Sequence, residues 1–193
     1  MAKQTDKAKQ LKELNKFCAD CQKCILGSTR TNLVFGVGNP DARIMFTGEA
    51  PGADEDRLGV PFVGRAGKLL DQCLADIGIA REDVYIANII KCRPPGNRDP
   101  LPAEIEACKE LLFAQIAIIQ PVVLCTLGRH AAETLLAIPD FKISRDHGKP
   151  MNWQGIVALP VFHPAAALHQ PANLTGLRFD FQQLKSLLER KGG

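Results

Sequence analysis

The stretch RIMFTGEAPGADEDRLGVPFVGRAGKLL, residues 43–70, has the pattern of a strand, a long loop and the start of a helix. Residues 43–47 form a short apolar run bounded by turn residues, which is typical of a strand that is buried on both faces. Residues 48–64 are rich in Gly and Pro and too numerous for a simple turn, and residues 64–77 have helical spacing. Because α/β sheets bind ligands at the carboxyl ends of their strands, this loop is the first candidate for a functional site.

The same alternation of strand and helix continues along the chain. Further strand-like runs occur at residues 84–90, 122–126 and 156–162, and helical spacing occurs at residues 102–119, 129–136 and 179–190. We therefore expect an α/β fold, a three-layer α/β/α sandwich with a central parallel sheet of about four strands. Residues 1–193 are expected to form a single domain, with residues 1–16 as a peripheral N-terminal helix.

The composition is that of an ordinary globular protein. The chain has 193 residues, of which 46% are hydrophobic and 23% charged, and its net charge of +3 neither requires nor excludes binding to nucleic acid. The N-terminal stretch MAKQTDKAKQLKELNKFC lacks the apolar segment of a signal peptide. No apolar run approaches the roughly 20 residues of a membrane span. These features predict a cytoplasmic protein without a membrane partner.

The cysteines contain two pairs with the spacing of metal ligands. Cys21 and Cys24 form a C-x2-C element, and Cys92 and Cys108 lie on either side of a Pro-rich loop. Four thiolates in two such pairs are typical of a tetrahedral zinc site or of a 4Fe–4S cluster, and the spacing alone leaves both open. Several buried thiols without a metal are the simpler alternative.

The remaining three cysteines stand outside these two pairs. Cys18 extends the first pair to the spacing of a bacterial ferredoxin run, but Ser28 stands where such a run needs its fourth cysteine. Cys73 lies in a helix-like segment and Cys125 in a strand-like one. We expect the thiols of Cys73 and Cys125 to be buried in the core.

Three side chains beside the predicted strands are candidates for a ligand pocket. Phe62 lies on a glycine-flanked loop, Asn88 is an amide inside an apolar strand, and His163 directly follows the last strand. Core packing of Phe62 and a structural hydrogen-bonding role for Asn88 and His163 are the alternatives. The ends of parallel strands meet at one edge of a sheet, so we expect the three side chains to lie together.

Four motifs occur in order along the chain, namely CQKCILGSTR at residues 21–30, GEAPGADEDRLGVPFVGRAGKLL at 48–70, NIIKCRPPGNRDP at 88–100 and HPAAAL at 163–168. Together they resemble the iron–sulfur family 4 uracil-DNA glycosylases of bacteria and archaea. The resemblance extends over residues 17–190. It implies the α/β/α sandwich of the uracil-DNA glycosylase superfamily and a 4Fe–4S cluster whose ligands are Cys21, Cys24, Cys92 and Cys108.

The resemblance also implies the activity. It is that of a monofunctional base-excision repair enzyme that hydrolyses the N-glycosidic bond of deoxyuridine in single- or double-stranded DNA and leaves an abasic site. We expect the enzyme to be a monomer. The target base must first be flipped out of the stack. The implied uracil-binding residues are Gly48, Glu49, Ala50, Glu55, Phe62, Asn88 and His163.

Individual roles follow from this resemblance. Phe62 stacks on uracil, Asn88 reads its Watson–Crick edge, and His163 donates to O2 as negative charge develops. Glu55 crowds the methyl group that distinguishes thymine.

Two further roles concern the water and the DNA stack. In the best-known uracil-DNA glycosylases an Asp that positions water occupies the place of Ala50. We therefore expect Glu49 to orient the water or stabilise the cationic sugar. Leu168 is expected to wedge into the DNA stack.

Two other classes of protein are weighed against this one. An iron–sulfur module that binds DNA lesions with little or no catalysis is the main alternative. A nucleotide-binding or redox protein is disfavoured, because the sequence has neither a G-x-G-x-x-G loop nor a P-loop.

Overall fold

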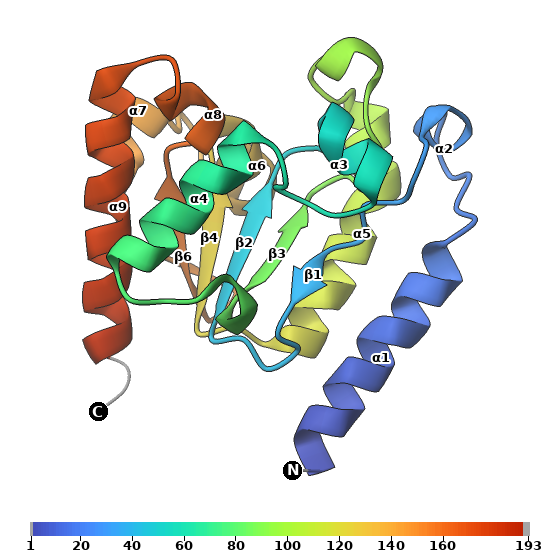
Figure 1. The fold of residues 1–193 in the computed structure, drawn as a ribbon, viewed down its shortest axis with the longest axis horizontal. Coiled ribbons are helices and arrows are strands. Elements are labelled where there is room, and N and C mark those ends of the chain that lie inside the picture. The colour runs from blue at the N-terminus through green and yellow to red at the C-terminus, as the bar shows by residue number, and fades with distance from the viewer. Residues whose placement is uncertain (1, 191–193) are drawn as a thin grey trace.

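A six-stranded sheet with the order β1-β3-β2-β4-β6-β5 runs through the structure (Figure 1). The computed structural model describes residues 2–190 of the chain. Four neighbouring strands at the centre are parallel, namely β3 (Tyr85–Asn88), β2 (Ile44–Gly48), β4 (Val123–Leu127) and β6 (Ile156–Val161). The predicted α/β fold with a parallel sheet of about four strands is confirmed.

Two short antiparallel strands at the sheet edges were not predicted. β1 (Val37–Gly38) pairs with β3, and β5 (Met151–Trp153) pairs with β6. With two and three residues, these strands are too short to show an apolar pattern in the sequence. They make the sheet mixed, and they cover the edges of the parallel strands.

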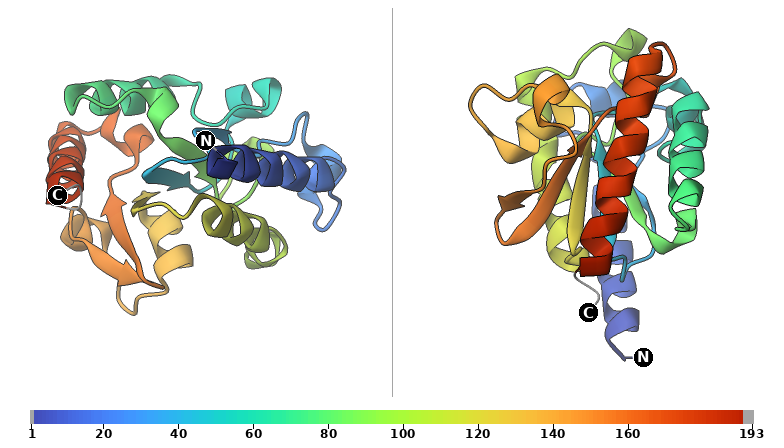
Figure 2. Two further views of the ribbon diagram at one scale, coloured as in Figure 1. Left: turned by 90° about the horizontal axis from the view of Figure 1, so that it is seen from below. Right: turned by 90° about the vertical axis from the view of Figure 1, so that its left-hand side faces the viewer.

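Helices cover both faces of the sheet (Figure 2). The apolar residues of α4 (Arg65–Asp76) and α9 (Pro171–Arg190) pack on one face. Those of α1 (Ala2–Cys18), α5 (Pro102–Ile119) and α6 (Arg129–Leu136) pack on the other. Short helical segments in the connections are α2 (Leu26–Thr29), α3 (Ala53–Leu58), α7 (Ile143–Asp146), α8 (Pro164–Ala167), η1 (Arg81–Asp83) and η2 (Pro95–Asn97).

Helix α9 begins at Pro171, eight residues before the predicted start at residue 179, so that boundary was wrong. Thr175 and Gly176 are weak helix formers and hide the first two turns of the helix in the sequence. Packing explains the glycine, since a Cβ at Gly176 would lie 2.5 Å from Cε2 of Phe162.

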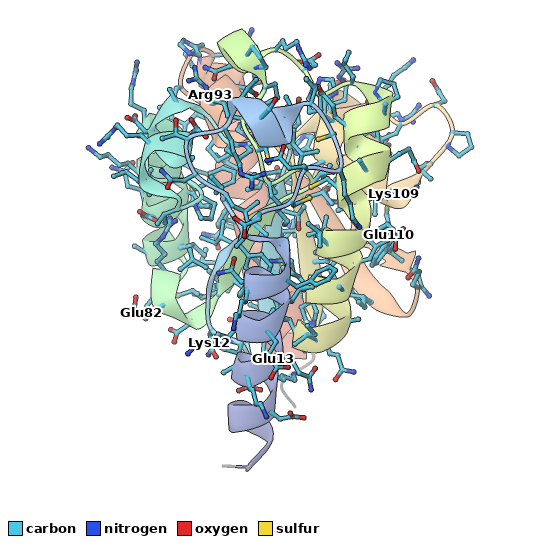
Figure 3. All side chains as sticks on the ribbon, turned by 90° about the vertical axis from the view of Figure 1, so that its right-hand side faces the viewer. Lys12, Glu13, Glu82, Arg93, Lys109 and Glu110 are labelled. Carbon is cyan, nitrogen blue, oxygen red and sulfur yellow. The ribbon has the colours of Figure 1, made fainter. Side chains whose placement is uncertain are left out.

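The predicted N-terminal helix is present and extends to Cys18. Leu11 is buried against the core, whereas Lys12 and Glu13 are exposed on its outer side (Figure 3). The predicted domain bounds also include Met1 and residues 191–193, which lie outside the described residues. Among residues 2–190, the structure contains no helix that is long and apolar enough to span a membrane.

Alternate residues of the central strands supply two apolar cores, one on each face of the sheet. Phe46 of β2 stacks on Phe181 of α9 with ring centroids 5.7 Å apart. Cys73 and Cys125 lie in the same core as this pair and are 1% and 0% exposed, so the prediction of two core thiols is confirmed. Burial raises the pKa of Cys73 to about 11, which keeps it a thiol.

A fully buried lysine ties the end of β3 to α5. Nζ of Lys91 donates to the Asn88 carbonyl at 2.7 Å and to Oε1 of Gln115 at 2.6 Å. Gln115 in turn donates to the Phe35 carbonyl at 2.9 Å and to the Tyr85 hydroxyl at 3.2 Å. Burial lowers the pKa of Lys91 to about 8. This network fixes the backbone that follows β3.

We predict that Lys91→Met lowers the free energy of unfolding by about 1–3 kcal/mol. Methionine keeps an apolar stem but leaves the Asn88 carbonyl and the Gln115 side chain without a donor. Urea unfolding measures the change. The control is Lys185→Met on the exposed side of α9, which should stay within about 0.5 kcal/mol of the wild type. Equal stability of Lys91→Met and wild type would show that the ammonium does not stabilise this network.

Candidate active site

A cavity of about 320 Å³ lies at the carboxyl ends of β2, β3 and β6. At this end of the sheet β2 and β4 point toward α3 and α8 (Figure 1). Of the residues predicted to bind a ligand, the cavity wall contains Glu49, Ala50, Glu55, Phe62, Asn88 and His163. Leu168 is not among its lining residues.

Gly48 lies directly behind this wall, at the end of β2. A Cβ at this position would lie 2.4 Å from Oδ1 of Asn88 and 2.7 Å from Cζ of Phe62. Only glycine therefore allows the amide and the aromatic ring to occupy their positions.

The loop after α3 holds Phe62 in a strained conformation. Phe62 has a φ of +53°, which side chains of this size rarely adopt, and its side chain is buried. Oε1 of Glu55 accepts hydrogen bonds from the Val63 and Gly64 amides, both at 3.0 Å. A Cβ at Gly67 would lie 1.8 Å from the Phe62 carbonyl oxygen, so glycine lets α4 pack directly against the loop.

Asn88 presents an unsatisfied acceptor at the cavity. The residue is 1% exposed, and its Oδ1 has no hydrogen-bond partner within the part of the chain that the structure describes. A buried amide oxygen without a donor is unfavourable, so a ligand that brings an N–H group gains a hydrogen bond here.

His163 follows β6 and caps the short helix α8. Its Nδ1 accepts a hydrogen bond from the Ala165 amide at 3.0 Å, so the neutral ring carries its proton on Nε2. Burial, with a smaller contribution from His130, lowers the pKa of His163 to about 4. The ring centroid lies 5.8 Å from that of Phe62. At neutral pH the cavity therefore contains an uncharged imidazole with an N–H donor.

A buried carboxylate that the sequence analysis missed supports this segment. Oδ2 of Asp180 accepts from the Phe162 amide at 2.9 Å, and its Oδ1 lies 2.6 Å from Nδ1 of His147. Asp180 is fully buried in α9. The only signal in the sequence was an acidic residue between Phe179 and Phe181, of which the first is exposed and the second buried.

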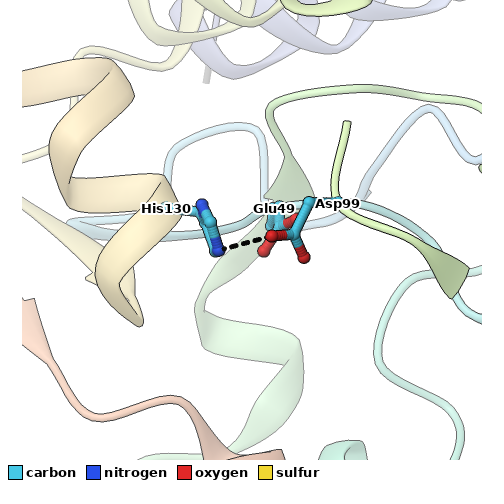
Figure 4. Close-up of side chains that lie close together, drawn as sticks. All are labelled: Glu49, Asp99 and His130. Carbon is cyan, nitrogen blue, oxygen red and sulfur yellow. Dashed lines mark ion pairs between the residues drawn. The ribbon is translucent and has the colours of Figure 1, made fainter. Parts of the chain in front are cut away.

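Glu49 is half-buried and lies beside two residues that had not been predicted. Ligand atoms of Glu49, Asp99 and His130 all lie within 4.8 Å of one another (Figure 4). Nε2 of His130 is 3.2 Å from Oδ2 of Asp99. Burial raises the pKa of Glu49, His130 and Arg129 act to lower it, and Asp99 acts to raise it. Asp99 lies within the motif at residues 88–100 but was given no role there, and His130 lies outside the four motifs.

The four predicted metal-ligating cysteines gather on the side of the sheet covered by α1 and α5. Burial raises the pKa of Cys108 to about 11 and that of Cys92 above its usual value. The neighbouring thiols Cys21 and Cys24 contribute to the shift of Cys92, and Cys92 and Cys24 to that of Cys108. Thiols from three separate segments therefore share one environment.

Cationic groups border these thiols. Nη1 of Arg30 donates to Sγ of Cys92 at 3.3 Å and to the Cys21 carbonyl at 2.7 Å. The Lys91 ammonium is close enough to Cys108 to lower the pKa of that thiol. Positive charge favours thiolates, which are the form that binds metal.

Cys18 differs from these four thiols. It is buried, and its Sγ donates to the Leu14 carbonyl within α1 at 2.6 Å. Burial, followed by the charge of Cys21, raises its pKa.

The fold and the site agree with the outcome of sequence comparison. The Uracil DNA glycosylase superfamily model matches residues 35–187, and the chain therefore belongs to this superfamily. It is 47% identical over 178 residues to the type-4 uracil-DNA glycosylase of Archaeoglobus fulgidus, covering 89% of each chain. It is 45% identical to that of Thermotoga maritima, covering 89% of this chain and 91% of the relative.

Within the superfamily the chain belongs to the type-4 uracil-DNA glycosylases. Its identity to the type-5 uracil-DNA glycosylase of Thermus thermophilus is lower, 36% over 53% of each chain. The family resemblance carried by the four sequence motifs is thereby confirmed.

We predict that the His163 imidazole titrates with a midpoint near pH 4 in the folded protein. Burial disfavours the charged ring, and the Ala165 amide occupies Nδ1 as a donor. NMR of ring protons across pH 3.5–8 measures the midpoint, with a His163→Gln variant to assign the signal. A midpoint above pH 6 would show that the ring is not held neutral.

Proposed function

We propose that this chain removes uracil from DNA by hydrolysing the bond between C1′ and N1 of deoxyuridine, releasing the base and leaving an abasic site. Membership of the type-4 family supports uracil excision in DNA repair. The observation that carries the site assignment is the unpartnered Oδ1 of Asn88 beside Phe62 and His163. We propose that one chain acts alone as a single domain in the cytoplasm, on single- or double-stranded DNA.

The cavity suits a base that has left the DNA stack. Its volume of about 320 Å³ is within the range of small-molecule sites. Phe62 provides an aromatic face for stacking. Uracil brings an N3–H donor to Oδ1 of Asn88, and its O4 accepts from the amide nitrogen. Cytosine has an acceptor at N3 and a donor at position 4, so it mismatches the same amide.

His163 stabilises the leaving group in this proposal. As the C1′–N1 bond breaks, its electron pair passes to the base, and negative charge spreads to O2 of uracil. At neutral pH the His163 ring is already uncharged, because burial lowers its pKa to about 4. The Ala165 amide holds the ring in the tautomer whose Nε2–H group donates to O2. Glu49 orients the water that adds to C1′.

Glu55 and Leu168 have proposed roles in selection and in base flipping. Glu55 lines the cavity, and its carboxylate is held by the loop amides, so it forms a rigid wall against the thymine methyl group. Gly52 gives this side chain room, since a Cβ there would lie 2.8 Å from Oε2 of Glu55. Leu168 is half-buried just after α8 and would act outside the cavity, as a wedge in the DNA stack.

We further propose that the four gathered cysteines hold a 4Fe–4S cluster. A single zinc ion with bonds of about 2.3 Å needs sulfurs roughly 3.8 Å apart. Among residues 6–190, no three cysteine sulfurs lie within 4.8 Å of one another, which favours the larger cluster. When bound, the cluster supplies a cross-link between the segment before α2, the loop after β3 and α5. The ligands are Cys21, Cys24, Cys92 and Cys108.

The activity is tested with a uracil-containing oligonucleotide, on which we expect uracil release and an alkali-labile abasic site. Asn88→Asp should lower the single-turnover rate of release about 100-fold or more, because the donor to O4 is replaced by a carboxylate. The control Asn152→Asp adds the same charge on the exposed edge strand β5 and should keep the wild-type rate. An unchanged rate for Asn88→Asp would remove the edge-reading role. DNA binding without uracil release by the wild type would favour the lesion-binding module instead.

The division of the cysteines is tested by iron and sulfide analysis. Cys18→Ser should keep about four iron and four sulfide atoms per chain, because the Cys18 thiol is engaged with the Leu14 carbonyl. The matched variant Cys92→Ser should lose cluster absorbance. Loss of the cluster in Cys18→Ser would place that thiol among the ligands.

A further inference from the structure

Hydrolysis needs a group that orients the attacking water. Ala50 has no polar side chain, and Glu49 is the adjacent carboxylate at the cavity. Any residue that fixes this carboxylate and keeps it ionised therefore influences hydrolysis.

We propose that His130 is a positioning residue for hydrolysis, which holds the Glu49 carboxylate toward the attacking water with Asp99 as the third member of the set. The inference rests on the proposed uracil excision. It adds a side chain to which neither the sequence motifs nor the family comparison assigns a role.

The three residues converge from three segments of the chain (Figure 4). Glu49 follows β2, Asp99 lies in the loop after β3, and His130 is in the first turn of α6, which follows β4. Their ligand atoms lie within 4.8 Å of one another. Glu49 and Asp99 line the cavity, so the group is at the reaction site.

His130 and the loop with Asp99 are held by their surroundings. Nε2 of His130 lies 3.2 Å from Oδ2 of Asp99 and 3.1 Å from Nη2 of Arg129. The loop with Asp99 is anchored by Arg98, which donates to the Asp99 carbonyl at 2.9 Å and forms two hydrogen bonds to the buried Glu104, at 2.9 and 2.6 Å. Nε2 donates to Asp99 when it carries a proton and accepts from Arg129 when it does not, so one of these two neighbours holds the ring in either state.

The charges around Glu49 determine how His130 acts. Burial raises the pKa of Glu49, and Asp99 raises it further, while His130 and Arg129 lower it. Arg129 is also drawn to Glu133, with Nη1 3.6 Å from Oε2. A protonated His130 thus offsets part of the burial cost and favours the carboxylate, which is the form that accepts a proton.

The chemical step balances with this assignment. The C1′–N1 bond breaks and its electron pair leaves with uracil, while the water oxygen forms a bond to C1′. The water proton passes to the Glu49 carboxylate and then to solvent, and the uracil anion takes a proton from solvent. His130 keeps Glu49 ionised and oriented and does not itself touch the reacting atoms.

The test is the pH dependence of single-turnover uracil release by His130→Ala and His130→Gln. We expect the rate at pH 7 to fall about tenfold in His130→Ala. Its acid limb should move to higher pH, because loss of the imidazole raises the pKa of the base that must be ionised. His130→Gln keeps a hydrogen-bonding side chain and should recover part of the rate, while its acid limb stays shifted. Affinity for a non-cleavable deoxyuridine analogue in DNA should not change.

The Glu49→Gln variant tests whether His130 acts through Glu49. Adding His130→Ala to it should have no further effect at pH 7, because the imidazole acts through the carboxylate and because His163, whose pKa is lowered mainly by burial and less by His130, is neutral at this pH in either case. Glu133→Gln, on the same helix and in contact with Arg129, should retain the wild-type rate. EDTA should leave wild-type release unchanged.

Three results would overturn the inference while the wild type still releases uracil. The first is a wild-type rate and pH profile in His130→Ala. The second is a loss of rate from His130→Ala in the Glu49→Gln background that equals its loss in the wild type. The third is loss of activity with EDTA, which would make the three residues a cation site. Absence of uracil release by the wild type would instead reject the proposed function itself.

Discussion

The hydrogen bonds of the buried Lys91 ammonium are the interactions on which both the cavity and the group of four cysteines depend. The ammonium donates to the Asn88 carbonyl on one side and to Gln115 of α5 on the other, and the backbone continues directly into Cys92. A charge removed from water must have its hydrogen bonds satisfied, so few backbone paths are open to this segment. Asn88 at the cavity and Cys92 of the cysteine group are four residues apart, so the hydrogen bonds of Lys91 fix the backbone that carries both.

The cavity is organised in advance of any ligand. Phe62 is held at a positive φ by the hydrogen bonds of Glu55, Asn88 has an acceptor without a donor, and His163 is neutral in one tautomer. The positive φ of Phe62 and the unpaired acceptor of Asn88 are costly for the free protein and are sustained by the packing around them. In the proposed mechanism, His163 stabilises charge as it develops, without having to reorganise during the reaction.

The elements that the sequence predicted well have strong local patterns. The central strands are continuous apolar runs, and α5 and α6 begin and end at the predicted residues. The start of α9 was wrong because Thr175 and Gly176 are weak helix formers, and the glycine is required by packing against Phe162. The strands β1 and β5 were missed because so few residues carry no periodicity. Six of the seven predicted uracil-binding residues line the cavity, and Gly48 lies behind its wall.

The sequence by itself determined the fold class, the family and the pool of side chains that meet at the strand ends, because apolar runs and glycine-rich motifs are local properties. Only the tertiary structure decided which polar groups share an environment. The juxtaposition of Glu49 with Asp99 and His130, and the support of the His163 segment by Asp180, depend on contacts between residues far apart in the chain. Burial and neighbouring charge, which set the protonation of these groups, arise only when the strands are assembled into one sheet.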